Sequence, residues 1–263
     1  MMELLMAAAL AAGLPAAPAE KADPAIFEVS DGDTTIYLFG TFHALDGRAD
    51  WFNEQVKTAF DRSGELILET VIPEGPTRIP MPRSISPAAR RITPTASYLA
   101  TTKMAINAGR SQGMKVSYGA DMVLRREAEH SGKYVEGLET LESQLAMFQQ
   151  MPAAAPAQAP KAGQPVDDGK MDALSNAMAE MQSAWKRGDQ RIFVQMLDQL
   201  NRSSPETYRL MFTERNARWA DWVAARMQSP GNVFVAVGAG HLVGKDSLLV
   251  RLAEMGIEST RMN

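Results

Sequence analysis

Cysteine is absent from this chain of 263 residues, and histidine occurs only three times. Without cysteine the protein forms no disulfide, no thiolate metal site and no cysteine-based covalent intermediate. The sequence also contains no His-Glu-x-x-His, no Gly-x-Ser-x-Gly, no phosphate-binding loop and no dinucleotide fingerprint. Several enzyme classes are thereby excluded, and few residues remain that could carry chemistry.

A strong charge of either sign is also missing. The chain has 27 basic and 31 acidic side chains, a net charge of −4, and no basic stripe, so we expect no nucleic-acid partner. Its hydrophobic content of 45% is ordinary for a globular protein. The one long apolar run, Leu4 to Leu14, is too short to cross a bilayer, and we expect no stable membrane span in the mature form.

The amino terminus has the pattern of an export signal. Its alanine-rich apolar run is followed by Ala17-Pro18-Ala19, a small-x-small site that predicts cleavage before Glu20. The segment before the run is atypical because it carries Glu3 and no lysine or arginine. Residues 1–19 are therefore predicted to be a signal peptide, with a secreted or periplasmic location; an alanine-rich tail is the alternative.

The remaining pattern, over residues 20–263, predicts a single α/β domain. We expect strands at 26–29, 35–39, 66–68, 115–118, 134–135, 233–237 and 257–261. We expect helices at 50–62, 97–112, 122–131, 139–151, 171–186, 190–200, 205–227 and 246–255. Residues 71–94 are rich in proline and predicted to be irregular, and residues 152–169 read as a flexible Pro/Ala-rich insert. The predicted fold is a central mixed sheet assembled from both chain ends, with a helical insertion or subdomain.

Two histidines end the same four-residue pattern, each directly after an apolar strand. The first pattern runs from Gly40 to His43, and the second runs from Gly238 to His241. Glycine permits a sharp turn, and ligands of open α/β sheets lie at the carboxyl edge where such turns occur. The spacing supports two interpretations: a shared metal site, or two histidines hydrogen-bonded at loop starts.

Other polar residues are candidates for the same edge. Glu69 directly follows the strand at 66–68 and could ligate a metal or activate its water; an exposed acid is the alternative. Asp121, after Gly119-Ala120, is a weaker case. Arg215 and the neighbouring Asn216 lie on a predicted helix, where Arg215 could hold a substrate carboxylate or oxyanion, or belong to a solvated face. No role is assigned to His130.

Together these segments resemble the TraB/GumN family, which is related to the Tiki metalloproteases. The resemblance covers the chain from about Ile26 to Met262. It depends on seven motifs in the family's order: Leu38–His43, Leu66–Thr70, Tyr118–Asp121, Gly137–Gln144, Trp185–Asp189, Glu214–Asn216 and Val235–Leu242.

The resemblance implies a site that uses a divalent metal, manganese, cobalt or zinc, to hydrolyse peptides. Carried over to this chain, it makes His43, His241 and Glu69 metal ligands, Glu69, Arg215 and Asn216 catalytic residues, and Gly40 and Gly238 the glycines of the site. The expected partner is a peptide or small-molecule substrate. The alternative is a non-catalytic protein that binds haem, a metal or a peptide on the same scaffold. Proximity is the first requirement, because all three ligands must reach one cation.

Overall fold

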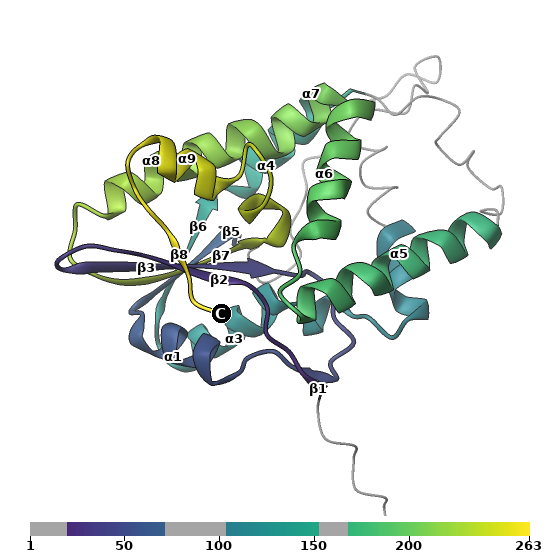
Figure 1. The fold of residues 1–263 in the computed structure, drawn as a ribbon. Helices are drawn as coiled ribbons and strands as arrows, with labels where there is room; N and C mark the ends of the chain where they lie inside the picture. Colours follow the sequence, from purple (N-terminus) through teal and green to yellow (C-terminus); the bar gives the residue numbers. More distant parts are fainter. Residues whose placement is uncertain (1–19, 72–103, 153–167) are drawn as a thin grey trace, which may run out of the picture.

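A computed structural model describes residues 20–71, 104–152 and 168–263, and within them it shows an α/β protein. These residues form a six-stranded mixed sheet with the order β6-β5-β7-β3-β2-β8 (Figure 1). Its strands are β2 (Ile26–Ser30), β3 (Thr34–Thr41), β5 (Glu65–Thr70), β6 (Tyr134–Glu139), β7 (Gly231–Gly238) and β8 (Thr260–Arg261). Two short strands, β1 (Glu20–Lys21) and β4 (Ala49–Asp50), pair separately.

The sheet is assembled from both ends of the chain, as the sequence predicts. Strand β7 lies between β5 and β3 and runs parallel to both of them. The pairing of Tyr37 with Phe234 and of Leu66 with Phe234 fixes this register. Strands β5, β7 and β3 therefore end at the same edge of the sheet.

Helices cover both faces of the sheet, and alternate residues of each central strand face opposite layers. Phe39 and Phe234 pack in one core with the helices α1 (Glu54–Arg62) and α3 (Ala120–His130). Leu38 and Val235 pack in the second core, against α8 (Glu214–Arg226) and α9 (Leu248–Glu254). Figure 1 shows these two layers on opposite sides of the sheet. Burial on both faces explains why the central strands are continuous apolar runs.

Further helices lie beside the carboxyl edge of the central strands (Figure 1). They are α4 (Leu141–Gln150), α5 (Asp168–Lys186), α6 (Arg191–Ser203) and α7 (Pro205–Tyr208), with residues 104–111 also helical. A π-helical turn, Arg209–Thr213, joins α7 to α8 and interrupts the single helix predicted at 205–227. No helix in the described ranges is long and apolar enough to cross a membrane.

The strand predicted at 115–118 is wrong. Val116–Tyr118 forms a turn of 3-10 helix, and Lys115 makes just one isolated bridge, with Leu45. The alternating pattern of this segment suits a strand, but its backbone hydrogen bonds close a local turn instead, with Gly119 N donating to Val116 O at 2.9 Å. Strand β6 is longer than predicted and includes Glu139, so α4 begins later than residue 139.

Some predictions fall outside the described residues. The signal peptide (1–19), nearly all of the irregular stretch at 71–94, the start of the helix at 97–112, and residues 153–167 of the insert belong to this group. The last residues of the predicted insert, Asp168 and Gly169, are part of α5 rather than irregular.

Candidate functional site

Three adjacent parallel strands bring the candidate residues to one edge of the sheet. Glu69 is the penultimate residue of β5, and His43 follows the end of β3 by two residues. His241 lies in a 3-10 turn, Ala239–Leu242, directly after β7. Helix α8 supplies Arg215 and Asn216, which are 3% and 1% exposed.

Glu69 is held as a carboxylate by positive charge and hydrogen bonds. Its Oε1 accepts a hydrogen bond from Gly238 N at 2.6 Å, and its Oε2 accepts one from Arg215 Nη2 at 2.7 Å. Oε1 also lies 3.7 Å from His241 Nε2. Burial raises the pKa of Glu69, but Arg215, His241, His43 and the Gly238 amide together hold it well below its usual range.

His241 is buried and held in one orientation. Asn216 Nδ2 donates to Asp246 O at 2.7 Å, so the Asn216 amide oxygen faces His241 Nδ1, 2.7 Å away. His241 Nδ1 therefore donates, and Nε2 accepts from Arg215 Nη1 at 3.2 Å. Burial and the Arg215 charge outweigh the charge of Glu69 and lower the pKa of His241 to about 3. The imidazole is thus neutral.

Two aromatic side chains pack against His241, and one of them comes from a π-helical turn. The rings of Phe212 and Trp219 lie 4.8 and 4.5 Å from the His241 ring. Phe212 belongs to the π-helical turn, and a Cβ on Gly240 would lie 3.2 Å from its ring. Trp219 also lies under the Arg215 guanidinium, at 4.5 Å. Such turns are often found at functional sites, and here one places Phe212 against the imidazole.

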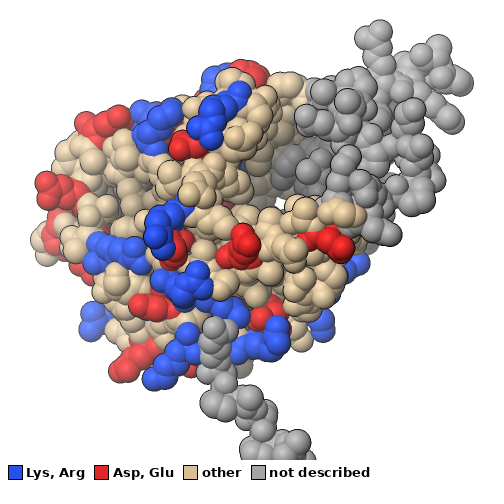
Figure 2. All heavy atoms as spheres, turned by 45° about the vertical axis from the view of Figure 1, so that its right-hand side comes forward, with Lys and Arg blue, Asp and Glu red and all other residues tan. Residues whose placement is uncertain are grey.

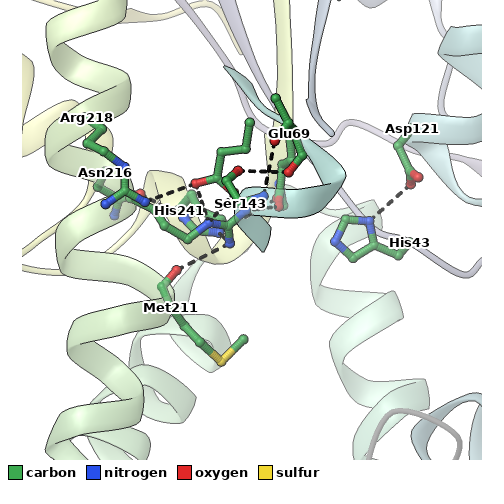
Figure 3. A network of polar contacts seen from close by, with 12 residues as sticks. His43, Glu69, Asp121, Ser143, Met211, Asn216, Arg218 and His241 are labelled. Carbon is green, nitrogen blue, oxygen red and sulfur yellow. Dashed lines mark hydrogen bonds and ion pairs between the residues drawn. The ribbon is translucent and has the colours of Figure 1, made fainter. Parts of the chain in front are cut away.

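His43 is the accessible imidazole of the site. Its side chain is 61% exposed, and its Nδ1 lies 3.2 Å from Asp121 Oδ1. Desolvation by the surrounding residues lowers the pKa of His43, but the hydrogen bond and charge of Asp121, with the charge of Glu69, raise it to about 9. Figure 3 shows the His43–Asp121 pair on one side of the site and the buried cluster around Glu69 on the other.

Gly238 separates these two halves of the site. Its backbone dihedrals, φ −52° and ψ 136°, suit any residue. A Cβ at this position, however, would lie 3.0 Å from Glu69 Oε1 and 3.3 Å from His43 Nε2. Glycine is therefore needed here for space, and both of these atoms face the same point.

Gly40, the glycine of the first Gly-x-x-His pattern, has a different position. A Cβ there would lie 3.2 Å from Ala239 Cα and would contact Leu242. Its carbonyl accepts a hydrogen bond from Trp185 Nε1 at 2.7 Å. Gly40 thus permits close packing of the two loops that carry the histidines and does not face the cluster around Glu69.

Glu139 belongs to the cluster, and the sequence analysis gave it no role. Its carboxylate lies at the end of β6, 7% exposed, with both oxygens 3.0 Å from Arg215 Nε. Arg218 Nη2 also donates to it, at 3.3 Å. A carboxylate after a short strand is the same signal that identified Glu69. It was missed because the strand was predicted to end at Val135.

The site fits a divalent cation in the chemistry of its donors. Each imidazole has its Nδ1 occupied by an acceptor, which is the usual support of a metal-ligating histidine, and Glu69 adds a charged oxygen. The hydroxyls of Thr41 and Thr70, beside the site on β3 and β5, are buried without a hydrogen-bond partner among the described residues. Buried polar atoms normally have a partner, so these two leave capacity for a ligand or water.

In this structure the side chains of His43, Glu69 and His241 are not arranged as a metal centre. Within the part of the chain that the structure describes, no three His, Asp or Glu side chains form a group able to hold a cation. Arg215 lies within hydrogen-bond distance of both His241 Nε2 and Glu69 Oε2. The guanidinium therefore faces the lone pairs that a cation would use.

The site thus consists of two Gly-x-x-His loops, a strand-end glutamate and a buried arginine on one α/β sheet. A family model described as the TraB/PrgY/gumN family matches residues 25–86 and 76–261, and the chain belongs to this family. The resemblance to the TraB/GumN family that the sequence motifs predict is confirmed.

Two relatives were found in the comparison with curated proteins. Both are described as "Uncharacterized protein YbaP", one from Escherichia coli (strain K12) and one from Shigella flexneri. Each is 32% identical over 138 residues, which is 52% of this chain and 48% of the relative. The chain therefore spans about half the length of the curated relatives it matches. No solved structure matches this chain.

Proposed function

We propose that this protein is an exported, divalent-metal-dependent hydrolase that cleaves peptides or related acyl substrates. One observation carries the proposal: three side chains from distant parts of the sequence, His43, Glu69 and His241, converge at the carboxyl edge of the sheet. These groups are an accessible imidazole, a buried carboxylate and a buried neutral imidazole, and they surround Gly238. Hydrogen bonds that only stabilise the fold do not require this combination.

His43, Glu69 and His241 are the residues that would hold the cation. When bound, a manganese, cobalt or zinc ion would polarise a substrate carbonyl and make water more acidic. Arg215 Nη1 would have to leave His241 Nε2 to free the lone pair that a cation would use. Further oxygen ligands would come from water or substrate.

The chain's own groups have separate tasks in this proposal. Glu69 is a carboxylate at neutral pH, so it accepts a hydrogen bond from a water and orients it toward the substrate carbonyl. Once released from His241 Nε2, Arg215 Nη1 would donate to the charge that develops on the carbonyl oxygen, while Nη2 keeps its hydrogen bond to Glu69 Oε2. His43 is exposed at the mouth of the site, and with its pKa raised to about 9 it would have to give up its Nε2 proton before it could bind the cation.

The test uses protein treated with a chelator and then given manganese, cobalt or zinc separately, with a mixture of short peptides as substrates. Hydrolysis should require added metal and should be lost in His43→Ala, Glu69→Gln and His241→Ala. His130→Ala is the matched control, because it removes the third histidine at the end of α3. Normal turnover by metal-free protein would overturn the proposal, as would full activity of His241→Ala.

A binding protein is the second candidate, and the contacts of Arg215 favour it. With Glu69 and His241 both satisfied by the guanidinium, His43 is the exposed imidazole of the site, and by giving up its Nε2 proton it could bind a ligand such as haem iron. Haem addition would then produce a Soret band that is lost in His43→Ala, with no peptide cleavage under any metal condition.

A further inference from the structure

A cavity of about 450 Å³ lies beside the candidate site and has no role in the function proposed above. Its apolar lining includes Ala44, Ile106, Met114 and Val116, and its cationic lining consists of Arg110 and Lys115. We call it the Arg110–Lys115 cavity. Its volume lies within the range of small-molecule and side-chain pockets, about 300–1,000 Å³.

The charge of this cavity differs from that of the chain as a whole. The protein carries a net charge of −4, and Figure 2 shows acidic and basic side chains interspersed over one face. The described lining of the cavity, by contrast, holds two exposed cations and no carboxylate. No carboxylate of the described residues forms an ion pair with either cation, and Lys115 Nζ lies over the Tyr118 ring at 5.0 Å. The cavity therefore favours an anionic group.

The wall of the cavity is fixed to the segment that carries His43. Lys115 N donates to Leu45 O at 2.8 Å, and Leu45 N donates back to Lys115 O at 3.3 Å. Ala120 N donates to Phe42 O at 3.0 Å, so the two segments run side by side on both sides of His43. Ala44, which lines the cavity, is the next residue after His43. A ligand in the cavity would thus contact Ala44, the residue that directly follows the exposed His43.

We infer that the Arg110–Lys115 cavity is a substrate subsite that binds an apolar side chain together with a nearby carboxylate of the same peptide. The apolar lining suits the side chain, and a guanidinium and an ammonium suit a carboxylate, which arginine can bind with two parallel hydrogen bonds. The carboxylate comes from the end of the peptide or from an acidic residue. The inference rests on the proposed function in one respect, because the ligand is a substrate only if the protein hydrolyses peptides. Binding of the ligand does not depend on turnover.

Isothermal titration calorimetry of N-acetylated peptides with chelator-treated protein tests the inference. The probes are Ala-Ala-Ala-Leu with a free carboxylate, the same peptide as an amide, and Ala-Ala-Leu-Glu as an amide. We expect the two carboxylate-bearing peptides, or one of them, to bind about tenfold or more tightly than the uncharged amide. Whichever binds more tightly identifies the source of the carboxylate.

The double variant Arg110→Gln/Lys115→Gln should remove this preference and leave binding of the uncharged amide unchanged. Lys57→Gln/Arg202→Gln removes the same charge at exposed positions elsewhere and is the matched control. Equal binding of acid and amide by the unmodified protein would overturn the inference. An equal loss in the control pair would do the same, because it would show general charge attraction. If hydrolysis is never found but the preference persists, the proposed reaction fails and the binding site stands.

Discussion

The strongest constraint on the site is the space at Gly238, and Gly238→Ala tests it directly. The backbone there accepts alanine, since φ is −52° and ψ is 136°. The added methyl group would lie 3.0 Å from Glu69 Oε1 and 3.3 Å from His43 Nε2. The substitution therefore changes the site without straining the main chain.

Both neighbouring groups must move by a few tenths of an ångström to accept the methyl group. The movement of Glu69 lengthens its 2.6 Å hydrogen bond from Gly238 N. Overpacking of this kind costs about 1–3 kcal/mol. Because a misplacement of about 1 Å costs roughly 100-fold in rate, the smaller shift expected here costs on the order of tenfold.

Two measurements check this prediction. Urea denaturation should show that the free energy of unfolding falls by about 1–3 kcal/mol in Gly238→Ala. Metal-dependent peptide hydrolysis, or metal affinity where no substrate is known, should fall about tenfold. Gly64→Ala is the control, because a Cβ there meets nothing within 4 Å. Unchanged stability and activity in Gly238→Ala would refute the argument that this glycine is retained for space.

Three further substitutions test the surrounding contacts. Glu139→Gln should lower the free energy of unfolding by about 1.5–3 kcal/mol by urea denaturation, because Arg215 loses a charged partner at 3.0 Å; no change would contradict it. Asn216→Leu should weaken metal-dependent activity while leaving far-UV circular dichroism unchanged, because His241 Nδ1 loses its 2.7 Å acceptor; full activity would count against the role of this bond. The pKa of Asp46 lies below its usual value. Burial raises this pKa, but the hydrogen bond from the Arg48 amide and the charge of Lys186 lower it by more, so the Asp46 carboxylate stabilises the fold above about pH 4. The stability difference between the protein and Asp46→Asn should therefore shrink as the pH falls below about 4, in urea titrations at several pH values; a constant difference would exclude the charge as its source.

The fold was largely predictable because its central strands are apolar on both faces. Short apolar runs such as 233–237 and 66–68 are typical of strands that are buried on both faces of a covered sheet. The segment at 115–118 shows the limit of this reasoning, because its alternation suits a strand, but among the described residues it forms only one isolated bridge, between Lys115 and Leu45. The π-helical turn at 209–213 was also missed, since nothing in its side chains distinguishes it from ordinary helix.

The candidate site was predictable where a polar residue follows a strong strand. His43, Glu69 and His241 all follow such runs, and the structure brings them to one edge. Glu139 ends a strand much as Glu69 does, but Glu136 and Gly137 weaken the strand signal of β6, so the sequence predicts that the strand ends at Val135. The contacts of Arg215 depend on how helix α8 packs on the sheet, which local sequence does not specify.

The insertion of β7 between β3 and β5 has a consequence for how the protein is made. The ribosome completes both neighbours long before it reaches residue 231, and until then the middle position of the sheet is empty. Pairings this distant along a chain close slowly. Until residue 231 is made, the edges of β3 and β5 that face β7 in the finished sheet have no partner there, and a chain that ends before residue 241 lacks the second imidazole of the candidate site.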